Sequence, residues 1–242
     1  MNNDNGMIGR RLSRREVLAV LGASGAAWLA GSPRAAAAAE VVSGALPSCI
    51  ARPQQTEGPF FVDEALERSD IRSDPFSGLV KAGVPLRLAF RVSRLSGATC
   101  SPLAGAQVDV WHCDASGRYS DVDRRSQNPR AGFLRGYQRT DAAGRVRFLT
   151  IYPGWYRGRA VHVHFKVRTR HGSAPAEEFT SQLYFDDALT DRIYALAPYS
   201  GNGHPPMRNA DDFIFRDGGR QLLVDAAPDA YGYAAAFDIA LA

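Results

Sequence analysis

From Pro85 onward, the chain alternates short runs of β-branched and aromatic residues with turn sequences. Such runs are typical of strands, and their short, regular spacing favours a two-sheet sandwich or a barrel. The predicted strands are 86–92, 107–111, 145–150, 161–169 and 180–185. Helical periodicity is scarce, and the best candidate, 187–197, ends before a proline. We therefore expect an all-β fold: a β-sandwich core with long loops and little helix.

Two turn sequences separate predicted strands. The segments 114–117 (Asp-Ala-Ser-Gly) and 141–144 (Asp-Ala-Ala-Gly) each begin with an aspartate that can bond nearby backbone amides. Each ends with a glycine, which tolerates a positive φ. The second segment predicts the tip of a hairpin between 137–140 and 145–148.

The first 39 residues have the order of an export signal. Arginines at 10–15 precede an apolar run at 17–30, and an alanine tract at 35–39 follows where a signal peptidase would cut. The run is shorter than the roughly 20 residues of a membrane-spanning helix. The segment 13–18 (Ser-Arg-Arg-Glu-Val-Leu) resembles the twin-arginine motif, which directs folded proteins across bacterial membranes, and an ordinary secretory signal is the alternative. We expect a periplasmic or extracellular protein, with the twin-arginine export machinery as a partner.

Charge and composition bear on the residues that follow the predicted signal, 40–242. Residues 40–84 are loop-rich and are expected to wrap a sandwich domain that covers 85–242. Removing 1–39 takes five arginines and two acidic residues from the 29 basic and 25 acidic side chains of the full chain, which leaves 24 and 23. Because this part is nearly neutral and has no basic run, no nucleic-acid partner is expected.

The three cysteines fit an oxidising compartment. Cys49 and Cys100 lie in loop-like sequence, whereas Cys113 directly follows the predicted strand 107–111. We therefore expect a Cys49–Cys100 disulfide, with Cys113 as a small buried hydrophobic residue.

Two histidines share one face of the predicted strand 161–169. Side chains of a strand alternate between its faces, so His162 and His164 point one way. Val161, Val163 and Phe165 point the other way and indicate the core. The pattern therefore predicts either a metal site or two hydrogen-bonded histidines on the polar face.

Two tyrosines favour a metal. Tyr156 lies just before the histidine strand, and Tyr119 follows the turn at 114–117. A phenolate is a hard, strongly donating ligand that suits ferric iron, whereas structural zinc prefers thiolate and imidazole. The alternatives are two core tyrosines with bonded hydroxyls, or a zinc or copper ion on the two histidines.

An ordered set of motifs adds to these residues. The segments are TEGP (56–59), VDVWHCD (108–114), GRYS (117–120), PGWY (153–156), RAVHVH (159–164) and QLYF (182–185). In this order the chain resembles the intradiol ring-cleavage dioxygenases, the family of the catechol, hydroxyquinol and protocatechuate dioxygenases. The set extends over most of the chain after the predicted signal, and the family's fold is also a β-sandwich.

The resemblance implies a ligand set: Tyr119, Tyr156, His162 and His164 would hold one mononuclear, non-haem Fe(III). Tyr156 would be the ligand that the substrate displaces, and it would accept a substrate proton. Arg159 and Gln182 would be catalytic neighbours, with Arg159 over the substrate. Regular alternation would place Arg159 on the face opposite His162, so we expect the strand to begin only near Val161.

The implied reaction uses O₂ and a small catecholic substrate. It cleaves the diol between its two hydroxylated carbons and yields a cis,cis-muconate-type diacid that carries both oxygen atoms. No pattern for the N-terminal dimer-linking helices of catechol-type members is present, so that dimer is not expected. His112, His171 and His204 match no ligand position. The alternative from another class is a non-catalytic extracytoplasmic β-sandwich binding module.

Overall fold

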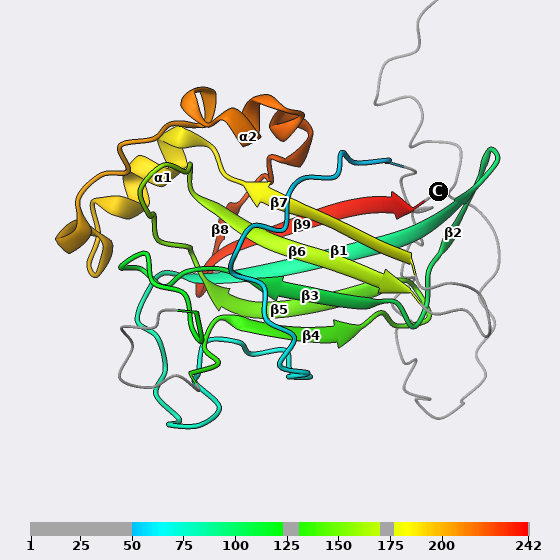
Figure 1. Ribbon diagram of the computed structural model, residues 1–242, viewed down its shortest axis with the longest axis horizontal. Coiled ribbons are helices and arrows are strands. Elements are labelled where there is room, and N and C mark those ends of the chain that lie inside the picture. Colours follow the sequence, from blue (N-terminus) through cyan, green and yellow to red (C-terminus); the bar gives the residue numbers. More distant parts are fainter. Residues whose placement is uncertain (1–49, 123–130, 170–176, 242) are drawn as a thin grey trace, which may run out of the picture. The chain divides into compact units, whose positions relative to one another are not determined.

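Two β-sheets pack face to face in the computed structural model, which describes residues 50–122, 131–169 and 177–241 (Figure 1). The first sheet contains β1 (Pro85–Ser96), β2 (Thr99–Pro102), β5 (Arg145–Ile151), β8 (Ala227–Asp229) and β9 (Gly232–Leu241). The second contains β3 (Gln107–Trp111), β4 (Arg135–Arg139), β6 (His162–Thr169) and β7 (Glu177–Tyr184). The predicted all-β sandwich is confirmed.

Each sheet is built around a central strand. In the first sheet, β1 pairs antiparallel with β2 and β5 and parallel with β9. In the second, β6 pairs antiparallel with β3 and β7, and β4 pairs with the far side of β3. The histidines of β6 therefore lie in the middle of a sheet, where a neighbouring strand on each side restrains the backbone.

Helix is limited to short segments of the described chain. The α-helices are α1 (Asp187–Tyr194) and α2 (Phe213–Arg216), and the 3₁₀-helices are η2 (Tyr199–Asn202), η3 (Asn209–Asp211) and η4 (Gly219–Leu222). The helix predicted at 187–197 is observed but ends at Tyr194, because the chain turns at Ala195 before Pro198. None of the helices in the described ranges is long and apolar enough to cross a bilayer.

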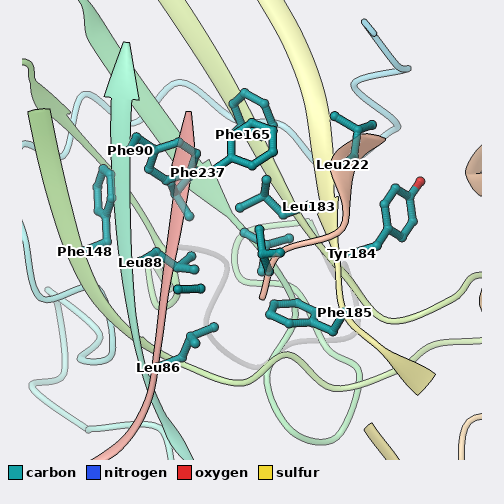
Figure 2. Close-up of a cluster of buried hydrophobic side chains, with 14 of the residues drawn as sticks. Leu86, Leu88, Phe90, Phe148, Phe165, Leu183, Tyr184, Phe185, Leu222 and Phe237 are labelled. Atoms are coloured by element: carbon teal, nitrogen blue, oxygen red, sulfur yellow. The ribbon is translucent and has the colours of Figure 1, made fainter. Parts of the chain in front are cut away.

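Aromatic and aliphatic side chains fill the space between the sheets (Figure 2). Alternate residues of β1, from Leu86 to Val92, are at most 2% exposed. Phe90 of β1, Phe165 of β6 and Phe237 of β9 contact one another, with ring centroids 5.4 to 6.2 Å apart. The apolar face of the histidine strand is thus fixed by the core, as its alternation predicts.

Phe165→Ala is expected to lower the free energy of unfolding by about 3–5 kcal/mol, because it leaves a cavity between the two sheets. Urea denaturation followed by tryptophan fluorescence measures this loss. Phe76→Ala removes a phenylalanine that is 59% exposed and should change stability by less than about 0.5 kcal/mol. Equal, small effects of the two substitutions would contradict the role given to the three-phenylalanine contact.

The turn at 141–144 forms, but the predicted hairpin around it is wrong. The Gly144 amide donates to the Asp141 carbonyl at 2.9 Å. However, β4 pairs with β3 in one sheet, while β5 pairs with β1 in the other. The turn therefore carries the chain from sheet to sheet, because alternation identifies the buried face of a strand and not its partner.

The segment 50–84 forms no helix and touches both sheets through isolated bridges, at Ala51–Ala240, Glu67–Tyr137 and Asp70–Leu149. Cys100 is disulfide-bonded and Cys113 is a free, buried thiol, as predicted. Cys49, the expected partner of Cys100, lies outside the described residues, as does the predicted signal at 1–39.

Candidate metal centre

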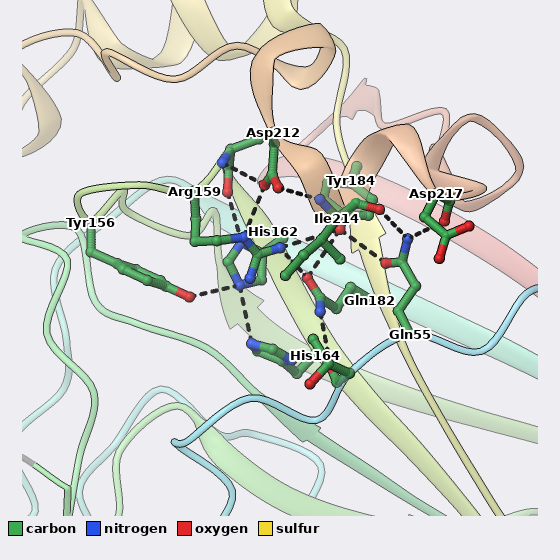
Figure 3. A network of polar contacts seen from close by, with 12 residues as sticks. Gln55, Tyr156, Arg159, His162, His164, Gln182, Tyr184, Asp212, Ile214 and Asp217 are labelled. Atoms are coloured by element: carbon green, nitrogen blue, oxygen red, sulfur yellow. Dashed lines mark hydrogen bonds and ion pairs between the residues drawn. The ribbon is translucent and has the colours of Figure 1, made fainter.

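β6 directs two imidazoles toward the same point. The Nε2 atoms of His162 and His164 are 3.0 Å apart (Figure 3). Nδ1–H of His162 donates to the Ala160 carbonyl at 2.7 Å, which leaves the lone pair on Nε2. Trp111 stacks on His164, with ring centroids 5.0 Å apart and planes 7° apart. Both rings are therefore held with Nε2 facing the centre.

Both imidazoles are neutral. Burial and, second, the positive charge of Arg159 lower the pKa of His162 to about 3. Burial and the adjacent His162 lower the pKa of His164 well below its ordinary value. The side chains are 2% and 1% exposed. Neutral imidazole is the form in which histidine binds a metal.

Two phenols complete the cluster. The Tyr156 hydroxyl lies 3.2 Å from Nε2 of His162 (Figure 3). Tyr119 lies beside it, with its ring centroid 5.6 Å from that of Tyr156 and 6.3 Å from that of His164. The Tyr119 hydroxyl is buried and has no hydrogen-bond partner among the described residues. Burial is the largest cause that raises the pKa of both phenols.

Glycines bring the two tyrosine loops into contact. Gly117 has a φ of +82°, and a Cβ there would lie 2.1 Å from the Trp155 carbonyl oxygen. A Cβ on Gly154 would lie 2.1 Å from the Asp114 carbonyl oxygen. Only residues without a Cβ let the two backbones approach so closely. The turn at 114–117 therefore sets the distance between Tyr119 and Tyr156.

Arg159 lies beside this cluster, in the turn that precedes β6. The strand begins at His162, one residue from the predicted start, and Gly158 has a φ of +90°. Because Arg159 lies in this turn and not in the strand, the alternation of side chains along the strand does not determine where it points. Its Nη2 donates to Oε1 of Gln182 at 2.5 Å (Figure 3). Gln182 is fully buried, and its Nε2 donates to the Thr56 carbonyl at 2.9 Å.

Three further residues hold Arg159 and Gln182. Asp212 accepts from Nε of Arg159 at 2.9 Å. The Tyr184 hydroxyl lies 3.0 Å from Oε1 of Gln182 and 2.9 Å from Oε1 of Gln55, and its single O–H can donate to either oxygen. No spacing in the sequence predicts Asp212 or Gln55 at this site. Tyr184 belongs to the QLYF segment at 182–185, which by itself indicates no role for it.

Aromatic rings and backbone form one wall of the site. Phe60 stacks on Tyr119 with centroids 4.4 Å apart and meets Tyr156 edge to face at 5.7 Å. Gly58 lies over His164, since a Cβ there would be 3.5 Å from Cε1 of that ring. The TEGP segment at 56–59 is the sequence signal for this wall, although it gave no role to Phe60.

The remaining histidines lie elsewhere or are bonded. His112 is buried, and its ring nitrogens contact the Cys113 carbonyl at 2.8 Å and Oγ1 of Thr150 at 2.6 Å. His204 has a side chain that is 65% exposed. His171 lies outside the described residues.

The cluster fits a metal ion. Two neutral imidazole nitrogens face each other at 3.0 Å, and beside them the buried hydroxyl of Tyr119 has no hydrogen-bond partner within the described residues. In the ranges that the structure describes, no three His, Cys, Asp or Glu side chains gather as a metal site. Metal binding here would therefore depend on the phenols, and phenolate with imidazole is a donor set that suits a ferric ion.

Comparison with known proteins identifies relatives of this chain. A model of the "Dioxygenase" family matches residues 56–198. The beta chain of protocatechuate 3,4-dioxygenase from Burkholderia cepacia is 35% identical over 173 residues, which cover 67% of this chain and 68% of that one. Catechol 1,2-dioxygenase 2 from Acinetobacter lwoffii is 30% identical over 158 residues, 55% of this chain and 51% of that one. The match thus spans about half the length of the second relative.

Solved structures show the same similarity. The intradiol ring-cleavage dioxygenase from Tetranychus urticae has a TM-score of 0.67 and 30% identity, over 79% of this chain and 94% of that one. The dioxygenase domain of a carbohydrate-binding fusion protein from Streptomyces sp. SirexAA-E has a TM-score of 0.56 and 30% identity, over 79% and 98%. The chain therefore belongs to the intradiol ring-cleavage dioxygenase family.

Proposed function

We propose that this protein is an Fe(III)-dependent intradiol dioxygenase. It would cleave a catechol-type diol between its two hydroxylated carbons with O₂, and the product would be a cis,cis-muconate-type diacid. The observation that carries the proposal is the convergence of two neutral imidazoles and two phenols on one buried point. Tyr119, Tyr156, His162 and His164 would hold the iron.

When bound, ferric iron would coordinate the diol and draw electron density from its ring, which makes the ring reactive toward O₂. Tyr156, which would bind the iron as a phenolate, is suited to take a proton from the substrate and become a phenol. It is partly exposed, whereas Tyr119 is only 5% exposed, so Tyr156 has more freedom to move. The charge of Arg159 opposes the rise that burial causes in the pKa of Tyr156.

Arg159 would bind and stabilise negative charge on the substrate. Its guanidinium is held on two sides, by Asp212 at Nε and by Gln182 at Nη2. A charge fixed in this way needs no reorientation as negative charge develops. Gln182 would orient Arg159, and the ring of Phe60, which stacks on Tyr119, would keep water away from that residue.

Iron loading with a panel of diols tests the proposal. The purified protein should bind one iron and show the broad visible absorption of Fe(III)–phenolate, and the zinc-loaded protein should be colourless. Oxygen uptake with catechol, substituted catechols, hydroxyquinol and protocatechuate identifies the substrate, and product spectra separate intradiol from extradiol cleavage. A protein that stays colourless with iron in air and consumes no oxygen would exclude the proposed reaction.

We also propose export through the twin-arginine route. The double substitution Arg14→Lys and Arg15→Lys should leave the precursor inside the cell, because the receptor of this route reads the arginine pair. Immunoblots of periplasmic and cytoplasmic fractions measure the distribution. Arg10→Lys with Arg11→Lys is the matched control, since it changes two arginines outside the motif. Normal export of the Arg14/Arg15 variant would instead favour the ordinary secretory route.

A further inference from the structure

Asp212 is a fully buried carboxylate, with 0% of its surface exposed. Its Oδ2 accepts from Nε of Arg159 and from the backbone amide of Ala160, each at 2.9 Å (Figure 3). Its Oδ1 accepts from the Ile214 amide at 2.8 Å and so caps α2. Burying a carboxylate is costly unless well-placed donors compensate for the lost water. Here the three donors of Arg159, Ala160 and Ile214 provide that compensation.

These contacts determine which edge of Arg159 is available. Nε is taken by Asp212, and Nη2 by Gln182 and the Tyr184 hydroxyl, at 2.5 and 3.3 Å. Asp212, Gln182 and Tyr184 therefore hold the guanidinium through Nε and Nη2, and their bonds do not involve Nη1. The planar guanidinium cannot turn without breaking the Asp212 bond. One edge of Arg159 is therefore anchored, which fixes the direction in which the rest of the guanidinium points.

The anchor also reaches the histidine strand. Asp212 binds the amide of Ala160, and the carbonyl of the same residue accepts from Nδ1–H of His162 at 2.7 Å. On the other side, Gln55 donates to the carbonyls of Ile214 and Asp217, both at 2.8 Å (Figure 3). Gln55, in the segment 50–84, thus holds α2, the helix that Asp212 caps.

We propose that Asp212 is the positioning residue for Arg159: it fixes the guanidinium so that its charge faces the substrate at the iron centre. The inference rests on the proposed function and adds a residue that touches neither iron nor substrate. Removing Asp212 should leave the four proposed ligands in place, release Arg159, and lower kcat more than it changes KM.

A double-mutant cycle separates this role from a merely structural one. Asp212→Ala should lower kcat about 10²-fold with full iron content when Arg159 is present. In the Arg159→Met background, the same substitution should lower kcat no further. Asp211→Ala, which removes the adjacent exposed carboxylate, is the matched control and should behave as wild type. If Asp212→Ala does not fold, Asp212→Asn replaces it in the cycle, with a smaller loss expected and the same dependence on Arg159.

NMR of the metal-free protein gives a readout that needs no activity. The Nε–H signal of Arg159, assigned by its loss in Arg159→Lys, should exchange slowly with water in the wild type and quickly in the Asp212 variants. Equal kcat losses with and without Arg159, or an unchanged Nε–H signal, would overturn the role of Asp212. A wild-type protein that binds no iron and cleaves no diol would instead refute the proposed function, while the NMR comparison would still test the Asp212–Arg159 anchor.

Discussion

Replacing His162 by alanine is expected to abolish both iron binding and turnover. Nε2 of His162 faces Nε2 of His164 at 3.0 Å and the Tyr156 hydroxyl at 3.2 Å, so it lies next to two of the other three proposed ligand atoms. Alanine has no donor atom, so the iron would lose one of its four proposed protein ligands at a buried position. Loss of a residue that merely supports a ligand already weakens metal binding about 10–100-fold, so loss of a ligand should exceed that.

Iron analysis of the purified protein, its visible absorption and its oxygen uptake measure the effect. His204→Ala is the matched control, because it removes a histidine whose side chain is 65% exposed and lies outside the cluster. Circular dichroism checks that the His162 variant keeps its sheets. A folded His162→Ala protein with full iron content and normal turnover would remove His162 from the ligand set.

Local patterns of the sequence predict the histidine strand well. The alternation of β6 identifies the apolar face because a strand in the middle of a sandwich must bury one face, and Phe165 lies in that core. The same reasoning places His162 and His164 together on the other face. Their convergence with Tyr119 and Tyr156 rested on a family resemblance, because the strand pattern cannot show which loops lie over a given face.

Strand partners and weak strands were harder to predict. β4 and β5 follow each other across a tight turn and still belong to different sheets. β9 was missed because Gly232 and the alanines at 234–236 have low strand propensity. Its stability comes from parallel pairing along most of β1, a contact between distant parts of the chain.

Asp212 shows a second limit of sequence reasoning. It lies between two short helical segments, in no motif, and 53 positions after Arg159 in the chain. Its hydrogen bonds to Arg159 and Ala160, just before β6, and to the Ile214 amide in α2 make it the carboxylate beside Arg159. The residues that carry chemistry were recognisable from their type and order, whereas those that hold them in place depend on tertiary contacts.

The two proposed tyrosine ligands should respond differently to loss of their hydroxyl groups. Tyr119→Phe is expected to weaken iron binding by more than about 100-fold. Tyr119 is 5% exposed and its hydroxyl has no alternative partner in the described chain, so no water can readily take its place at the metal. Tyr156→Phe should keep part of the iron, because Tyr156 is partly exposed and water can occupy the position that its oxygen leaves.

Turnover should separate the same two residues. In Tyr156→Phe, the retained iron should turn over about 10²–10⁴-fold more slowly, because the variant lacks the phenolate oxygen that we propose accepts a substrate proton. Iron content, the phenolate absorption band and kcat per bound iron are measured together, with Tyr231→Phe, a tyrosine that is 75% exposed, as the control. Equal iron contents in the two variants, or normal kcat per iron in Tyr156→Phe, would contradict this division. Equal iron contents would mean that burial does not decide which phenolate stays on the metal. Normal kcat per iron would mean that a group other than Tyr156 accepts the substrate proton.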